Sequence, residues 1–163
     1  MKVAIIMGSD SDWPVLKPAL QLLTEFGLET EVIVASAHRT PAKVHDFVAT
    51  APERGVKVFI AAAGAAAHLP GVVASMTTLP VIGVPIYGTA LNGLDALLSI
   101  VQMPSGIPVG TMALNGAKNA AIFAAQILAV GNPSIQDKLL VHRQNMVDEV
   151  EAKAAKVLAD QSF

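Results

Sequence analysis

The sequence contains no cysteine, few aromatic residues and few charges. Without cysteine, disulfide bonds and thiolate metal ligands are excluded. Charged residues make up 15% of the chain, well below the usual share of about a quarter. No run of basic residues could form a nucleic-acid surface, and the net charge is −2. We therefore expect no nucleic acid as a partner.

Long hydrophobic runs are also missing, although 53% of the residues are hydrophobic. Gly, Pro, His or Asn interrupts each run before the roughly 18 residues that a membrane helix needs. The opening stretch MKVAIIMGSDSD has one lysine and a short apolar run with no cleavage-like site after it, so we expect no signal peptide. These features predict a cytoplasmic protein without a membrane partner.

The hydrophobic residues are mainly small aliphatic ones, and their number relative to the charged residues indicates whether the chain forms an oligomer. A chain of 163 residues forms one domain and leaves much surface outside its core. Charged residues are too sparse to cover that surface, so we expect part of it to be buried against other copies. The prediction is a homo-oligomer, and an alanine-rich monomer is the alternative.

Apolar runs of strand length alternate with amphipathic segments of helix length along the chain. The expected strands are 2–8, 29–36, 56–64, 80–85 and 107–114. The expected helices are 12–27, 41–55, 67–78 (starting after Pro70), 92–103, 115–130 and 133–163. Strands buried on both faces and followed by helices predict a parallel five-stranded sheet. The fold class is α/β: a three-layer α/β/α sandwich, flavodoxin-like or Rossmann-like, in a single domain of residues 1–163.

The C-terminal segment 133–163 does not fit this alternation. It follows a Gly-Asn-Pro break and brings no strand of its own. We expect it to be an extra helical tail that packs on a neighbouring subunit or at the periphery of the domain.

Polar residues follow the first expected strand in the motif MGSDSD. Gly8 permits a tight turn, and the hydroxyls of Ser9 and Ser11, with the free N–H groups of the next helix, favour an anion such as phosphate. Asp12 could accept hydrogen bonds from sugar hydroxyls. The same residues also suit an ordinary helix N-cap, so the motif alone leaves both interpretations open. It matches neither G-x-G-x-x-G nor a Walker loop, which disfavours a nucleotide cofactor.

The motif SAHRTP follows the second strand. Arg39 carries a fork of donors suited to phosphate or carboxylate, and His38 can gain or lose a proton near neutral pH. Arg39 could instead be a surface residue, and His38 could cap the next helix, for which Thr40 is the expected N-cap. Their place at the carboxyl end of a central strand favours a binding site.

The third strand leads into AAAGAAAHLPG, whose small residues allow close approach of a ligand. Its alanines suit a small neutral species, and His68 is either functional or structural. No two of the four histidines have metal-ligand spacing, and no G-x-S-x-G elbow is present. We expect no metal and no cofactor.

Five blocks in one order, MGSDSD, SAHRTP, AAHLPG, PVIGVP and LLSIVQMPSGIPVGT, resemble those of the N5-carboxyaminoimidazole ribonucleotide mutase (PurE) family of purine biosynthesis. The resemblance implies an isomerase that moves a carboxylate from the exocyclic nitrogen to C4 of a phosphorylated aminoimidazole ribonucleotide. It implies no cofactor, and a homo-octamer whose sites lie where subunits meet.

The resemblance also implies roles for individual residues. His38 is the general acid and base, Ser9 and Asp12 hold the substrate, Arg39 binds its phosphate, and the loop 67–71 closes over the imidazole. The full set of expected substrate-binding residues is Gly8, Ser9, Ser11, Asp12, Ser36, Arg39, Gly64, Ala65, His68 and Leu69.

The sequence departs from the family pattern at two positions, and two other functions remain as alternatives to the mutase. Ala62 and Ala65 stand where the family usually has glycine, and an alanine is costly wherever the backbone needs a positive φ. A second branch of the family carboxylates aminoimidazole ribonucleotide directly with CO₂, and it resembles SAHKGP where this chain has Arg39 and Thr40. The third reading is a binding module for a phosphoribosyl ligand without catalysis.

Overall fold

The computed structural model describes residues 1–88 and 90–161. Its centre is a parallel sheet in the order β2-β1-β3-β4-β5. The strands are β1 (Lys2–Met7), β2 (Glu29–Val34), β3 (Val56–Gly64), β4 (Val81–Ile86) and β5 (Gly110–Thr111). The helices are η1 (Asp10–Asp12, a single 3₁₀ turn), α1 (Trp13–Glu25), α2 (Pro41–Ala49), α3 (Leu69–Ser75), α4 (Leu94–Val101), α5 (Ala117–Ala129) and α6 (Pro133–Asp160).

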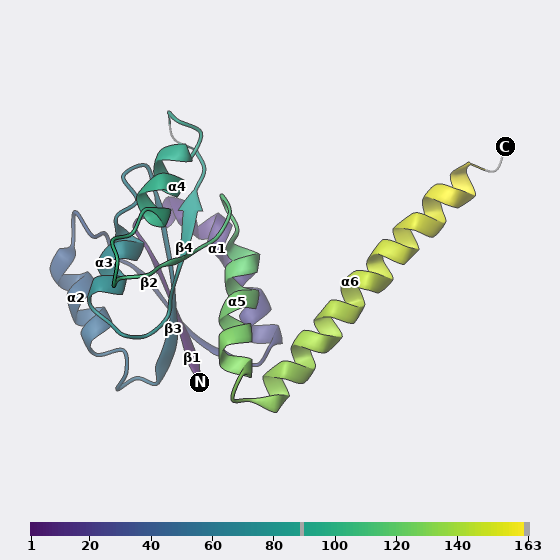
Figure 1. The fold of residues 1–163 in the computed structure, drawn as a ribbon, viewed down its shortest axis with the longest axis horizontal. Helices are drawn as coiled ribbons and strands as arrows, with labels where there is room; N and C mark the ends of the chain where they lie inside the picture. Colours follow the sequence, from purple (N-terminus) through teal and green to yellow (C-terminus); the bar gives the residue numbers. More distant parts are fainter. Residues whose placement is uncertain (89, 162–163) are drawn as a thin grey trace.

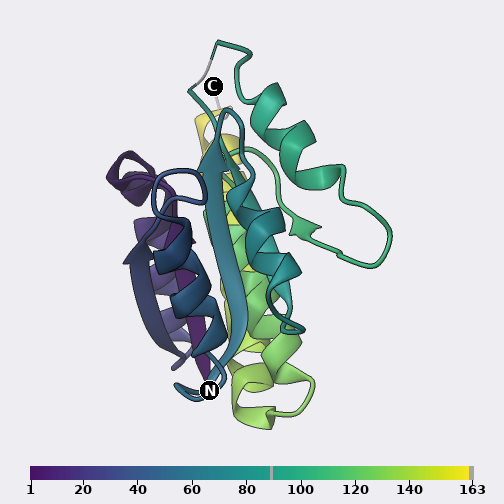
Figure 2. The same ribbon diagram turned by 90° about the vertical axis from the view of Figure 1, so that its left-hand side faces the viewer.

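Helices cover both faces of the sheet (Figure 1), which confirms the predicted three-layer α/β/α sandwich. Helices α1 and α5 pack on one face around a core that contains Ile5 and Ile60. Helices α2, α3 and α4 pack on the other face around a core that contains Phe59. Figure 2 turns this side toward the viewer. Strands β1, β3 and β4 are almost entirely buried, as their continuous apolar sequences predict.

The edges of the sheet differ from the sequence-based expectation. The fifth strand, expected over 107–114, is reduced to two residues that pair with Ile82 and Gly83 of β4. Pro108 has no N–H to contribute to a ladder, which limits how far pairing can extend at that side. Strand β2, which was expected to be a central strand, instead forms the opposite edge. Its Val32 and Val34 are 42% and 43% exposed.

An ion-pair network holds edge strand β2 to the rest of the domain. The carboxylate of Glu31 accepts hydrogen bonds from Nζ of Lys2, on β1, and Nε of Arg54, which precedes β3, each at 2.9 Å. Burial alone would raise the pKa of Glu31, but the hydrogen bonds and charges of Lys2 and Arg54 hold that pKa below its ordinary value. The ionised carboxylate therefore helps to fix the end of the sheet opposite the site described below.

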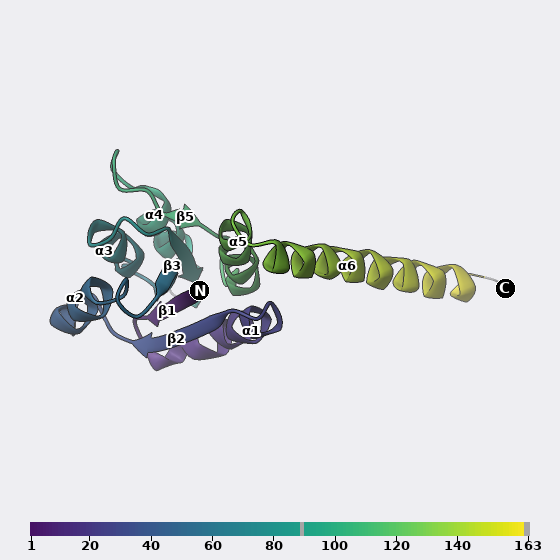
Figure 3. The ribbon, with the colours of Figure 1, turned by 90° about the horizontal axis from the view of Figure 1, so that it is seen from below.

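Helix α6 begins against α5 and then leaves the domain as a straight arm (Figure 3). Asn132 caps its first turn by accepting from the N–H groups of Ser134 and Ile135, and only Ile135 and Leu139 are buried. Apolar residues continue along the exposed part: Leu140, Val141, Met146, Val147, Val150, Val157 and Leu158. No helix within residues 1–88 and 90–161 is long and apolar enough to cross a membrane. The tail was expected to reach residue 163, and residues 162–163 lie outside the described part.

Candidate active site

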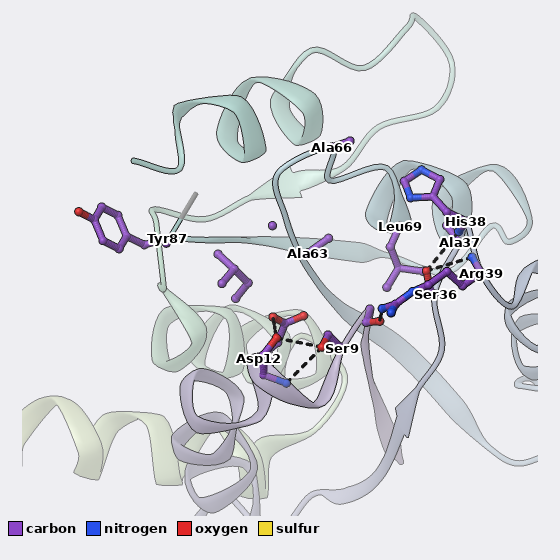
Figure 4. Close-up of a pocket in the computed structure, with 15 residues that line it drawn as sticks. Ser9, Asp12, Ser36, Ala37, His38, Arg39, Ala63, Ala66, Leu69 and Tyr87 are labelled. Atoms are coloured by element: carbon purple, nitrogen blue, oxygen red, sulfur yellow. Dashed lines mark hydrogen bonds between the residues drawn. The ribbon is translucent and has the colours of Figure 1, made fainter. Parts of the chain in front are cut away.

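A cavity of about 650 Å³ opens where β1, β2, β3 and β4 end (Figure 4). Its lining comes from the four loops that follow these strands, at the carboxyl edge of the sheet where parallel α/β folds bind ligands. The volume suits a small organic molecule. All residues expected to contact substrate line this cavity except Ala65 and His68.

The segment 86–88 also lines the cavity, although it was not among the site residues predicted from the sequence. Ile86 ends β4, and β4 lies beside β3. The carboxyl ends of neighbouring parallel strands open at the same edge, so the end of the PVIGVP strand was the signal that could have found it. The ring of Tyr87 points away from the other lining residues (Figure 4).

The first loop builds a polar wall from Ser9, Ser11 and Asp12. Ser9 caps the 3₁₀ turn: its Oγ accepts from the backbone N–H of Ser11 at 3.3 Å and from the Ser11 hydroxyl at 2.9 Å. Asp12 occupies the N-cap position of α1 without capping it. The N-cap interpretation therefore holds for Ser9 and fails for Asp12.

The carboxylate of Asp12 lies on the cavity wall even though the residue is only 7% exposed. Burial raises its pKa, and hydrogen bonds from the Ser11 side chain and the loop backbone offset part of that rise. A buried carboxylate whose charge is only partly satisfied favours new donors. The hydroxyl groups of a ribose are donors of this kind.

The second loop is held rigid by its own hydrogen bonds. The Ser36 hydroxyl accepts from the N–H groups of His38 (3.3 Å) and Arg39 (3.2 Å). The Thr40 hydroxyl accepts from the N–H of Ser36 at 2.8 Å. Thr40 does stand at the N-cap position of α2, but its hydroxyl braces Ser36 and does not cap the helix.

Arg39 links the first two loops. Its Nη2 donates to the backbone carbonyl oxygen of Gly8 at 3.0 Å, and its side chain lines the cavity. This bond uses one of the five N–H donors of the guanidinium group and leaves the others for an anion. Arg39 and Ser9 both line the cavity, so both are available to an anion such as phosphate.

His38 contacts a second histidine. Its Nε2 lies 2.8 Å from Nδ1 of His68, and the two ring centroids are 4.9 Å apart with the planes nearly perpendicular, at 81°. His38 lines the cavity beside the loop that carries Ala66 (Figure 4). His68 does not line the cavity itself, but it directly contacts His38, which does.

Apolar side chains from the second and third loops also line the cavity. Ala37, Ala63 and Ala66 contribute no hydrogen-bonding side chain, and Leu69 adds a larger apolar surface. Within the described residues, no group of three or more His, Cys, Asp or Glu side chains could hold a metal ion. The chemistry available at this site is proton transfer by a histidine, with anion and hydroxyl binding around it.

Of the two alanines that stand where the family usually has glycine, only Ala65, in the loop after β3, has a strained backbone conformation. Ala65 has φ +53°, in the left-handed region, whereas Ala62 lies inside β3 and has no positive φ. An L-residue in the left-handed region costs roughly 1–2 kcal/mol, and glycine does not pay this cost. The concern raised by the sequence applies to Ala65 and not to Ala62.

Replacement of Ala65 by glycine is expected to raise the free energy of unfolding by about 1 kcal/mol, because strain is removed from the folded state. For a chain of this size the corresponding rise in Tm is about 2–4 °C. Ala62→Gly is the matched control, because the same change in a buried strand should lower stability. Equal destabilisation of both variants in thermal unfolding would contradict the assignment of strain to Ala65.

The chain was compared with known proteins. The family model described as AIR carboxylase matches residues 2–149. The chain belongs to this family. Among curated members, the N5-carboxyaminoimidazole ribonucleotide mutase of Pyrococcus horikoshii is 57% identical over 155 residues, which cover 95% of this chain and 88% of the relative. The Thermotoga maritima enzyme of the same name is 54% identical, over 96% of this chain and 91% of its own.

Solved structures agree with the sequence comparisons. The crystal structure of Treponema denticola PurE matches with a TM-score of 0.84 and 28% identity. The match covers 95% of this chain and 97% of the other. The resemblance read from the five sequence blocks is confirmed.

Proposed function

We propose that this chain is an N5-carboxyaminoimidazole ribonucleotide mutase of purine biosynthesis, acting in the cytoplasm. The observation that carries the proposal is the convergence of His38 and Arg39 with Ser9 and Asp12 on one cavity. These four residues come from two separate loops, and their groups match the parts of the substrate: a phosphate, a ribose and a ring that exchanges a proton. The identity to curated mutases over most of the chain supports the same conclusion.

In the proposed reaction His38 carries one proton in both directions. The protonated imidazole gives a proton to the exocyclic nitrogen, the bond from that nitrogen to the carboxylate carbon breaks, and CO₂ leaves. C4 of the imidazole ring then attacks CO₂, and the neutral His38 removes the proton from C4. The histidine ends in its starting state, so a single group serves as acid and then as base.

The alanine side chains that line the cavity have a role in this scheme, because CO₂ must stay beside the ring between the two steps. The apolar surface made by Ala37, Ala63 and Ala66 offers no hydrogen-bonding side chain to water, so in the proposed reaction it favours CO₂ over water beside the ring. Recapture then resembles a unimolecular step with a high effective concentration of CO₂.

Direct carboxylation of aminoimidazole ribonucleotide by CO₂ is the second candidate, and the name of the matching family model favours it. An isotope experiment separates the two reactions. The carbamate substrate, labelled with ¹³C in its carboxylate, is incubated with the enzyme in excess unlabelled bicarbonate. A mutase places the label in the C4 carboxylate of the product, whereas a carboxylase yields unlabelled product. Loss of most of the label would overturn the mutase assignment.

A non-catalytic phosphoribosyl-binding module is the remaining alternative. It predicts binding of the ribonucleotide with no conversion of either substrate above the uncatalysed rate. The same isotope experiment addresses it, because formation of C4-carboxylated product faster than in the enzyme-free control excludes it.

We also propose that the enzyme is a homo-octamer in which the tail 133–163 packs on a neighbouring subunit. Exposed apolar residues on α4 and α6 support this assembly, among them Leu94, Leu98 and Val150, which are 52%, 46% and 62% exposed. Surfaces of this kind mark protein–protein contacts. The molar mass in solution, measured by light scattering, tests the proposal, and a monomer would contradict it.

A further inference from the structure

The contact between His38 and His68 shows which ring nitrogen of His38 faces the protein. Nε2 of His38 lies 2.8 Å from Nδ1 of His68. Among the described residues, Nδ1 of His38 has no hydrogen-bond partner. One nitrogen of His38 is therefore engaged by the protein, and the other is open to a ligand in the cavity that His38 lines.

A hydrogen bond between two ring nitrogens contains one proton, so one nitrogen donates and the other is bare. A histidine that acts as acid and then as base must be stable both as imidazolium and as neutral imidazole. In the imidazolium form Nε2 of His38 carries a hydrogen, and the bond then survives only if Nδ1 of His68 is bare. A single arrangement supports both states: His68 carries its proton on Nε2 and accepts at Nδ1.

We propose that His68 is a positioning residue that accepts this hydrogen bond and fixes the ring plane and tautomer of His38. Nδ1 of His38 is then the atom that gives a proton to the exocyclic nitrogen and later takes one from C4. The inference rests on the proposed function of His38. A base whose second nitrogen is held by an orienting group is a recurring arrangement in enzymes.

The side chain of His68 can be changed without dismantling its loop. The backbone N–H of His68 donates to the carbonyl of Ala66 at 2.8 Å, and its own carbonyl accepts from Val72 at 2.9 Å. These bonds do not involve the imidazole, and His68 is exposed. Within the described residues, the side chain hydrogen-bonds only to His38.

Two substitutions of His68 separate positioning from bulk. His68→Leu fills the space but offers no acceptor, and we expect kcat to fall about 10-fold, a part of what an acid–base group supplies, with little change in KM. His68→Asn restores an acceptor, because the asparagine oxygen sits as far from the backbone as Nδ1 of histidine. We expect it to recover most of kcat. His45→Leu, at an exposed position on α2, is the matched control.

The tautomers can be read without any turnover, by ¹⁵N NMR of labelled histidine in the free enzyme. We expect a bare Nδ1 on His68 and a protonated Nε2 on His38 in the wild type, and loss of that fixed tautomer of His38 in His68→Leu. A protonated Nδ1 on His68, or unchanged kcat in His68→Leu, would overturn the inference. Failure of the wild type to convert the carbamate would instead overturn the proposed function while the NMR result stands.

Discussion

Replacement of His38 by asparagine is expected to lower kcat by about 10²–10⁴-fold, the contribution of a positioned acid–base group. Asparagine has no nitrogen that can gain and lose a proton near neutral pH, so neither proton transfer of the proposed reaction has a carrier. The fold should be unaffected, because His38 is exposed and the loop is braced by the hydroxyls of Ser36 and Thr40. Steady-state rates with the carbamate substrate measure the effect, and circular dichroism measures the fold.

Binding should be largely retained in this variant, because the groups assigned to phosphate and ribose are untouched. Calorimetry with the ribonucleotide is expected to give a Kd close to that of the wild type. His45→Asn makes the same chemical change at an exposed histidine outside the cavity and should keep wild-type kcat. A His38→Asn enzyme with normal kcat, or one that loses binding and turnover in equal proportion, would contradict the assigned role.

Arg39→Leu is expected to lower kcat/KM by about 100-fold, chiefly through KM. A hydrogen bond to a charged group contributes roughly 1.5–3 kcal/mol, and each 1.36 kcal/mol is a factor of ten. The variant also loses the bond from Nη2 of Arg39 to the carbonyl oxygen of Gly8, which joins the two loops proposed to hold the phosphate. Steady-state kinetics over a range of carbamate concentrations measures the change.

Two further variants separate the geometry of Arg39 from its charge. Arg39→Lys keeps the positive charge without the planar fork of donors, so we expect an intermediate loss. Lys43→Met removes a cation from α2 that does not line the cavity but donates to the carbonyl of Val34. We expect this control to change KM by less than about 3-fold, since an exposed charge at a distance is screened by salt. Equal effects of Arg39→Leu and Lys43→Met would mean that long-range attraction, and not a phosphate contact, explains the result.

The sequence by itself determined the class of fold and most of the cavity lining. Strands that are buried on both faces must be largely apolar, so β1, β3 and β4 can be predicted from continuous apolar runs in the sequence. In a parallel sheet every strand ends at the same edge, so the polar motifs after the first two strands had to lie near each other. The same logic extended to β4 would have found residues 86–88.

The tertiary structure alone decided how the loops meet. His38 and His68 are 30 residues apart, and only the order β2-β1-β3-β4-β5 and the path of the third loop place their nitrogens 2.8 Å apart. The φ of +53° at Ala65 depends on that same path, and no local pattern encodes it. The sequence also did not determine the hydrogen bonds of the Thr40 hydroxyl and the Asp12 carboxylate. Each residue stands at a helix N-cap position, but neither side chain caps the helix. Apolar patterning fixes which elements are buried, whereas contacts between side chains on different loops arise only when the packed sheet brings those loops together.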